Sequence, residues 1–448
     1  MAEEKAHSGF KKYTINTSFL FLERVLRAVV MIIFWVFVIR YLGPQQFGVL
    51  SYALSLIFLF SDLCEFGIRD IAVREIVRHP HRENELLGSI LFIKFIGSLI
   101  AISLTVIYLV FFSSGSSTNV IVCILALQFL FTPFETLEYY FQSQVLAKFL
   151  AYSRVFEMLI SSALYITFVF LKKPLIYFAW VNVFEFVIMS AGLVFFYARL
   201  HKSILNWKIS ASIVKEMFKV SWPLIFASVA ASIYFRIDQV MIKSFLNITE
   251  VGYYSAAVRV SEAFYFIPIV ITSSVLPAII YAKKESSELY NKRIDALLCL
   301  LAMISFTIAV FITIFAHPIV SMFFGPEFLP AAGVLSIHIW GSLFIFVPAG
   351  GKKWIISENL QMYAMITAVL GAILNIVLNY FLLPIYGIKG AAAATVIAFA
   401  FSGIFGYAFF KQTWPIFILQ LKAFNLFYLW QNRLTLSRDL LENAGVRK

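Results

Sequence analysis

The sequence predicts an all-α membrane protein with about twelve transmembrane helices in two pseudo-symmetric six-helix lobes. Its 448 residues are 61% hydrophobic and only 13% charged, whereas soluble domains carry about 25% charged residues. Apolar runs of about 18 residues or more recur along the chain, which is the pattern of transmembrane helices. A similar short segment occurs once in each half of the chain. Together these three observations predict the fold class.

The length of the apolar runs indicates helices rather than a barrel. Backbone groups in lipid must pair within the protein, so spans are helices or closed barrels. Barrel strands alternate in polarity over about ten residues, whereas these runs are continuous. The polar N-terminus lacks the cleavage pattern of a signal peptide, so we expect the first run to remain as a span.

Twelve spans fit the apolar runs, and short joints separate most of them. We expect them at residues 14–39, 47–68, 86–111, 119–141, 151–171, 175–199, 219–243, 253–280, 294–317, 330–350, 361–384 and 387–410. The predicted parts of the chain are a tail at 1–13, an N-lobe at 14–199, a linker at 200–218, a C-lobe at 219–410 and a basic tail at 411–448. The charged joint 69–85 and the short apolar run Trp414–Trp430 are expected to form helices at the membrane surface.

The distribution of Lys and Arg places both termini on the cytoplasmic side. With the N-terminus inside, 26 of the 36 basic residues fall in inward joints and tails, five in outward joints and five within spans. Cytoplasmic joints carry such an excess. The net charge of +12 therefore reflects membrane topology. No nucleic-acid binding is expected, because there is no soluble basic domain to carry it.

Two polar hinges predict the internal repeat. The segment Tyr41–Ala53 joins the first two spans, and a degenerate copy, Leu246–Ala257, joins the seventh and eighth. A Leu, a Gly, a Ser and an Ala recur at one offset of 204 residues. Because six spans separate the copies, the lobes share an orientation and are related by an axis along the membrane normal. We expect a cavity between them near the midplane.

Five cations within the predicted spans are the candidate substrate-binding residues. Charge inside a span costs about 2.5–3.5 kcal/mol on insertion scales, so it normally faces a protein interior or a wet cavity. Guanidinium groups stay charged and bind phosphate in a bidentate manner. If spans one, two, seven and eight meet at the repeat axis, these cations form a ladder for a phosphate-bearing substrate. They are Arg24, Arg27, Lys94, Arg236 and Arg259.

Internal ion pairs are the alternative role for these cations. Arg259 and Glu262 are three residues apart on a helix, where two side chains can meet. Arg236 and Asp238 are two residues apart and diverge. Lys94 lies near the inner end of its span, where a long stem can reach the surface. The sequence leaves both roles open.

Acidic residues within spans have two candidate roles, coupling to an ion gradient and anchoring at the inner membrane interface. Burial favours the protonated carboxyl, so such groups can carry protons or bind a cation. Glu135 and Glu138 follow Pro133, which is expected to kink the fourth span. No cofactor, catalytic residue, metal cluster or nucleotide-binding loop is predicted. The candidates for H+ or Na+ coupling are Asp62, Asp238 and Glu262.

The residues around the first hinge carry a family pattern. It consists of Asn16-Thr17, Arg24, the run Arg40–Gly48, Tyr52-Ala53 and Asp70–Glu75. This pattern resembles the polysaccharide transporter family, in particular the Wzx-type O-antigen flippases of the multidrug/oligosaccharidyl-lipid/polysaccharide exporter superfamily. The superfamily also holds multidrug-and-toxin-extrusion antiporters and the lipid II flippase. The resemblance covers residues 13–80 and recurs at 218–280.

The resemblance implies a flippase of the bacterial inner membrane that works by alternating access and is not an enzyme. The implied substrate is an undecaprenyl-diphosphate-linked oligosaccharide, a repeat unit of O-antigen or another surface polysaccharide. Arg24 and Arg259 lie where the lipid II flippase uses arginines. The implied partners are the lipid bilayer, a polysaccharide polymerase and a chain-length regulator.

Two other functions are open at the level of sequence. A cation-coupled small-molecule antiporter of the same fold would have a cavity that is acidic more than cationic. A membrane polysaccharide polymerase would need a large outward catalytic loop, and none of the predicted outward joints is long enough.

Overall fold

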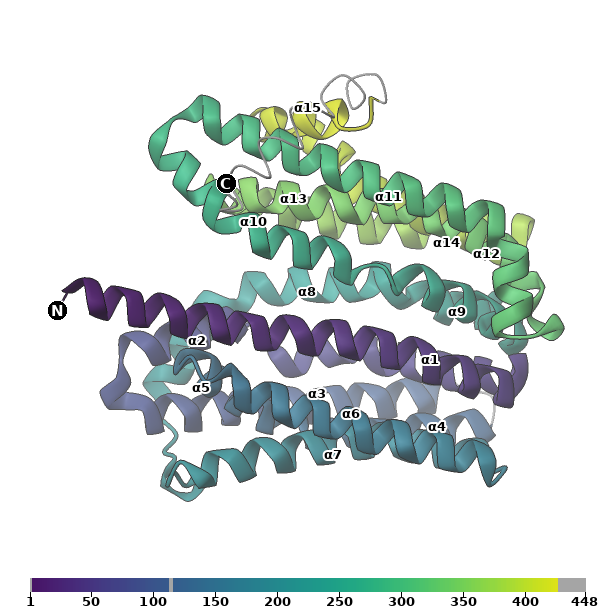
Figure 1. The fold of residues 1–448 in the computed structure, drawn as a ribbon. Coiled ribbons are helices and arrows are strands. Elements are labelled where there is room, and N and C mark those ends of the chain that lie inside the picture. Colours follow the sequence, from purple (N-terminus) through teal and green to yellow (C-terminus); the bar gives the residue numbers. More distant parts are fainter. Residues whose placement is uncertain (1, 113–115, 426–448) are drawn as a thin grey trace. The chain divides into compact units, whose positions relative to one another are not determined.

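The computed structural model describes residues 2–112 and 116–425, and for residues 2–29 and a few later positions it describes the backbone alone. The described residues form helices joined by short turns (Figure 1). The α-helices are α1 (Ala2–Glu65), α2 (Arg69–Arg78), α3 (Glu83–Phe112), α4 (Ser116–Ala126), α5 (Thr136–Ser143), α6 (Ala147–Phe170), α7 (Leu175–Arg199), α8 (Ala211–Phe245), α9 (Ile248–Glu262), α10 (Phe266–Glu285), α11 (Ser287–Phe323), α12 (Pro330–His338), α13 (Leu343–Ser357), α14 (Gln361–Gly403) and α15 (Trp414–Lys422). The 3-10 helices are η1 (Pro80–Arg82), η2 (Leu127–Leu130), η3 (Thr132–Glu135), η4 (Ile204–Asn206), η5 (Pro326–Phe328), η6 (Ile339–Ser342), η7 (Phe405–Phe409) and η8 (Lys411–Thr413).

Ten helical stretches among the described residues are long and apolar enough to cross a membrane. They confirm the predicted class, an all-α multi-pass membrane protein. Two long helices, α1 and α14, each hold two of the predicted spans. Each breaks at a glycine where those spans meet, Gly43 at φ 65°, ψ 173° and Gly387, the first residue of the twelfth predicted span, at φ 59°, ψ −146°. Only glycine occupies this backbone region readily, so Gly43 fixes the break within the first predicted hinge and Gly387 fixes the break in α14.

The fourth span of each predicted lobe is interrupted by 3-10 turns. Between α4 and α5 the chain forms η2 and η3, and Pro133 lies in the first turn of η3. Between α12 and α13 it forms η6. An interruption frees carbonyl groups that a regular helix would pair, and in a membrane the protein must satisfy them. Ser190 meets this need by donating a hydrogen bond of 3.2 Å to the carbonyl of Phe131.

The chain groups into two compact units, residues 1–240 and residues 241–448. The first has a core around Leu87, Ile90 and Tyr139. The second has its own core, which includes Leu297 and Phe346. The boundary lies near the end of α8, so residues 211–240 group with the first unit, whereas the sequence assigned 219–243 to the C-lobe. The predicted lobe limits stay a prediction.

Two short helices fall where surface helices were expected. In α2, Ile71 and Ile76 are buried while Arg74 and Arg78 are exposed, which is the amphipathic pattern of an interfacial helix. α15 has only nine residues, whereas about 20 are needed to span a bilayer. Residues 426–430 of that apolar run lie outside the described part of the chain. The position of both helices at the membrane surface stays a prediction.

Candidate functional site

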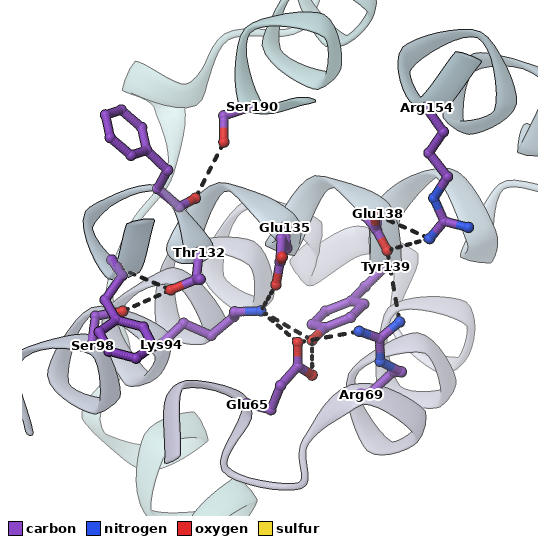
Figure 2. Close-up of polar contacts among 12 residues, drawn as sticks. Glu65, Arg69, Lys94, Ser98, Thr132, Glu135, Glu138, Tyr139, Arg154 and Ser190 are labelled. Carbon is purple, nitrogen blue, oxygen red and sulfur yellow. Dashed lines mark hydrogen bonds and ion pairs between the residues drawn. The ribbon is translucent and has the colours of Figure 1, made fainter. Parts of the chain in front are cut away.

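A network of charged side chains lies inside the first unit (Figure 2). It joins the end of α1, the start of α2, the middle of α3, the turn η3 and the helices α5 and α6. Three carboxylates and three cations take part together with one tyrosine, so the formal charges balance. We call it the Lys94 network, and its members are Glu65, Arg69, Lys94, Glu135, Glu138, Tyr139 and Arg154.

Lys94 occupies the centre of this network. Its side chain is 0% exposed, and its Nζ lies 2.9 Å from Oε2 of Glu135 and 3.0 Å from Oε1 of Glu65. It also donates to the hydroxyl of Tyr139 at 3.3 Å. That hydroxyl in turn donates to Oε2 of Glu65 at 2.7 Å. The ammonium therefore has three oxygen partners, which compensate for its removal from water.

Arg69 extends the network toward the protein surface. It contacts Glu65 at 3.2 Å and Glu138 at 3.7 Å. Glu138 also pairs with Arg154 through both of its carboxylate oxygens, at 3.1 and 3.2 Å. Burial on its own would lower the pKa of Arg69, but the nearby Glu65, Tyr139 and Glu138 outweigh burial and raise that pKa. Arg69 therefore stays charged.

Close backbone packing brings these residues together. A Cβ at Gly97 would lie 2.4 Å from the carbonyl oxygen of Leu63, so only glycine lets α3 approach the end of α1 this closely. Lys94 is three residues before Gly97, on the same helical face. After α1, Phe66 and Gly67 both adopt positive φ, and this short turn leads directly into α2. Glu135 lies in the turn η3 and contacts the Lys94 ammonium, which Glu65 contacts from the end of α1.

The network connects six helical elements through ion pairs and hydrogen bonds. Buried pairs gain little over apolar packing, but a charge that loses its partner inside a protein costs several kcal/mol. The elements are therefore expected to move as one body or to exchange partners together. Contact of Lys94 with a substrate stays a prediction, since in this conformation two carboxylates already surround its ammonium.

A second polar face runs between α1 and α8 in the first unit. Ser55 donates a hydrogen bond to Gln239, Ser232 donates one to Asp62, and the guanidinium of Arg236 lies 5.2 Å from the ring centre of Phe58. Residue numbers rise along α1 as they fall along α8, so the two segments run antiparallel. The sequence predicted Asp62 and Arg236 as functional residues, and the structure places them on this shared face.

The other predicted residues are spread over both units. Asp238 is buried in α8. Arg259 and Glu262 are half-buried in the last turn of α9. The side chains of Arg24 and Arg27 lie outside the described part of the structure. The ladder of cations across the membrane and the coupling roles of the acids stay predictions.

Sequence reasoning missed how Glu65, Glu135 and Tyr139 enclose Lys94. The partners of Lys94 lie 29, 41 and 45 residues away, so helical spacing could not pair them. The sequence offered one signal. Glu65, Lys94 and Glu135 all lie toward the predicted inner ends of spans two, three and four, and therefore at a similar depth in the membrane. Within the described residues, no three His, Cys, Asp or Glu side chains are placed to hold a metal ion.

The fold and the charged residues inside its spans define a multi-pass membrane protein of transporter type. Residues 14–281 match the family described as polysaccharide biosynthesis protein, which is more than half of the chain. The chain belongs to this family of the superfamily of multidrug, oligosaccharidyl-lipid and polysaccharide exporters. Residues 223–381 also match the MatE family.

Two relatives cover most of the chain. It is 26% identical over 400 residues to the probable low-salt glycan biosynthesis flippase Agl15 of Haloferax volcanii, covering 85% of this chain and 80% of that protein. It is 21% identical over 406 residues to the capsular polysaccharide biosynthesis protein CapF of Staphylococcus aureus, covering 89% of this chain and 99% of that protein.

Solved structures share the fold. The inward closed conformation of the lipid II flippase MurJ superposes with a TM-score of 0.65 at 16% identity, covering 92% of each chain. An inward-facing multidrug resistance transporter of the MATE family gives a TM-score of 0.65 at 14% identity, covering 92% of this chain and 95% of that chain. These likenesses confirm the predicted fold class.

Proposed function

We propose that this protein is a flippase that moves a lipid-linked oligosaccharide across the membrane by alternating access. The observation that carries the proposal is the family match over residues 14–281, together with a relative named as a glycan biosynthesis flippase along 85% of the chain. The fold shared with a lipid II flippase supports it. In this role the protein is a transporter and not an enzyme.

The proposed substrate carries a diphosphate on undecaprenol. The intramembrane arginines Arg24, Arg27, Arg236 and Arg259 would receive the diphosphate, because guanidinium groups pair with phosphate oxygens in a bidentate manner. The excess of basic residues in the inward joints supports an orientation with both termini in the cytoplasm of a bacterial cell. A polymerase and a chain-length regulator would act on the exported units.

Deletion of the gene followed by analysis of lipid-linked glycans tests this function. Loss of surface polysaccharide, with undecaprenyl-linked repeat units retained in the inner leaflet, is the expected result. Completed single units that appear outside without being polymerised would instead indicate a polymerase. The joint between α6 and α7 (residues 171–174) and the joint between α8 and α9 (246–247) are short, which argues against a catalytic loop there.

A second candidate is a cation-coupled antiporter of small molecules. The match of residues 223–381 to the MatE family favours it. Efflux of a cationic dye from cells that express the protein would support this function. An unchanged dye content, in cells that regain surface polysaccharide, would exclude it.

A further inference from the structure

An open pocket lies within the second unit, away from the Lys94 network. It encloses about 590 Å³, within the range of small-molecule sites in proteins. The joint before α9, the first turns of α9 and α12, and the break in α14 all contribute to it. We call it the Tyr386 pocket, and it is lined by Leu246, Asn247, Glu250, Leu329, Pro330, Gly333 and Tyr386–Lys389.

Two glycines shape this pocket. Gly387 adopts φ 59° at the break in α14. Tyr386 lies just before this break and Lys389 just after it. Gly333 leaves room for Lys389, because a Cβ there would lie 2.5 Å from its Cε and 3.2 Å from its Nζ. The stem of Lys389 therefore lies against α12, and its exposed side chain contributes an ammonium to the pocket lining.

The polar groups of the pocket suit a ring rich in hydroxyls. Tyr386 is 63% exposed and offers an aromatic face. Glu250 supplies a half-buried carboxylate acceptor. The Oδ1 of Asn247 accepts from the backbone N–H of Glu250 at 3.0 Å, which leaves its NH₂ group to donate to a ligand. Apolar carbons beside these groups match the mixed lining of ligand sites.

The pocket lies at the predicted outer end of the second unit. The basic clusters Lys283-Lys284, Lys292-Arg293 and Lys352-Lys353 fall in or beside the opposite joints, which lead into α11 and α14. Positive charge marks the cytoplasmic side. The pocket would therefore face the side on which an exported glycan emerges.

We propose that the Tyr386 pocket binds one sugar unit of the exported glycan. The aromatic ring of Tyr386 would lie against the C–H face of the sugar, while Glu250 accepts from its hydroxyls and Asn247 and Lys389 donate to them. The pocket lining holds one carboxylate, Glu250, and one ammonium, Lys389, so its formal charges balance and a neutral ring suits it better than a bare phosphate. This inference rests on the proposed function, because that function brings a glycan to this face.

Saturation-transfer NMR on the full chain in lipid nanodiscs tests the pocket. The probes are glucose, galactose, N-acetylglucosamine and glucuronate, with inorganic phosphate as a competitor. At least one sugar is expected to receive saturation from the protein. Its affinity should fall about tenfold, which is about 1.4 kcal/mol, in Tyr386→Ala, which removes the aromatic face, and in Glu250→Gln, which removes the charged acceptor.

Matched control variants keep the test specific. Tyr380 is an exposed aromatic residue on α14, and Glu327 is an exposed acid in η5, and neither lines the pocket. Tyr380→Ala and Glu327→Gln should bind the sugar as the wild type does. The inference is overturned if no probe binds, if phosphate displaces the sugar completely, or if the pocket variants bind as the controls do.

Flippase activity is measured separately on the same preparation. Translocation of a lipid-linked oligosaccharide without sugar binding at the pocket would refute this inference and leave the proposed function standing. Sugar binding that depends on Tyr386, without translocation, would refute the proposed function and leave a glycan-binding pocket.

Discussion

Lys94 and Glu135 form an ion pair with 2.9 Å between Nζ and Oε2, and the lysine side chain is fully enclosed by protein. One partner lies in the middle of a long helix and the other in the 3-10 turn that interrupts the next span. The pair therefore connects a regular span to an irregular one. Glu65 and Tyr139 complete the contacts of the ammonium.

Replacing Lys94 with methionine is expected to destabilise the protein strongly. The change leaves carboxylates without their shared cation, and breaking a buried pair costs about 3–5 kcal/mol. The midpoint of thermal unfolding in detergent measures the effect. Lys202→Met is the control, because Lys202 pairs with Glu83 at 2.8 Å but is 43% exposed. Such surface pairs contribute about 0–1 kcal/mol, so this variant should lose little stability. Equal unfolding midpoints for the two variants would contradict the conclusion that Lys94 stabilises the protein through its buried ion pairs.

Gly97→Ala is expected to separate α3 from the end of α1. The added Cβ would meet the carbonyl oxygen of Leu63 at 2.4 Å, and such overpacking costs about 1–3 kcal/mol. Gly192→Ala is the matched control, since its Cβ would meet the hydroxyl of Ser153 at 3.0 Å, which has more room to shift. Denaturant unfolding measures the stability of both variants. If the Gly192 variant is as unstable as the Gly97 variant, the close approach of α3 to α1 is not the cause of the destabilisation.

Gly387→Ala tests backbone strain without a steric clash. A Cβ there would meet nothing within 4 Å, yet the backbone conformation is one that other residues adopt at a cost of about 1–3 kcal/mol. The unfolding midpoint should therefore fall. The nearby Ile385→Ala, at a side chain that is 69% exposed, should leave it unchanged. An unaltered midpoint for the glycine variant would show that the break in α14 does not need glycine.

Asp62→Asn tests the proposed coupling to an ion gradient. Asparagine keeps an acceptor for the hydroxyl of Ser232 but removes the charge and the titrating proton. Transport into proteoliposomes should then no longer respond to an imposed Na+ or H+ gradient. Glu75→Gln, in the amphipathic helix α2, should keep the response. If the Asp62 variant responds to the gradient as the wild type does, Asp62 does not couple transport to the ion gradient.

The fold could be predicted from sequence because membrane spans follow from composition and length. The hinge at Gly43-Pro44 was visible as a polar segment between apolar runs, and Pro133 indicated the first interrupted span. The turn Ile339–Ser342 contains no proline and gave no such signal. Local pattern predicts where helices begin and break, because those rules depend on near neighbours along the chain.

The candidate site was harder to predict because its partners are distant in sequence. Lys94 was recognised as an intramembrane cation, but its contact with Glu135 depends on how α3 packs against η3. The same limit applies to Asp62, whose contact with Ser232 spans 170 residues. Intramembrane charges can be found from sequence, whereas their pairing needs the packed structure.

The central claim is tested most directly by reconstituting the purified protein in liposomes with a fluorescent undecaprenyl-diphosphate-linked oligosaccharide in both leaflets. Accessibility of the labelled sugar to a membrane-impermeant quencher reports translocation. Wild type and Arg78→Ala, at an exposed position on α2, are expected to equilibrate the two leaflets. Arg236→Ala and Arg259→Ala should be slowed at least about tenfold, since losing a charged hydrogen bond costs about 1.5–3 kcal/mol. If liposomes that contain the wild-type protein keep the inner-leaflet lipid inaccessible to the quencher, as liposomes without protein do, the account is contradicted.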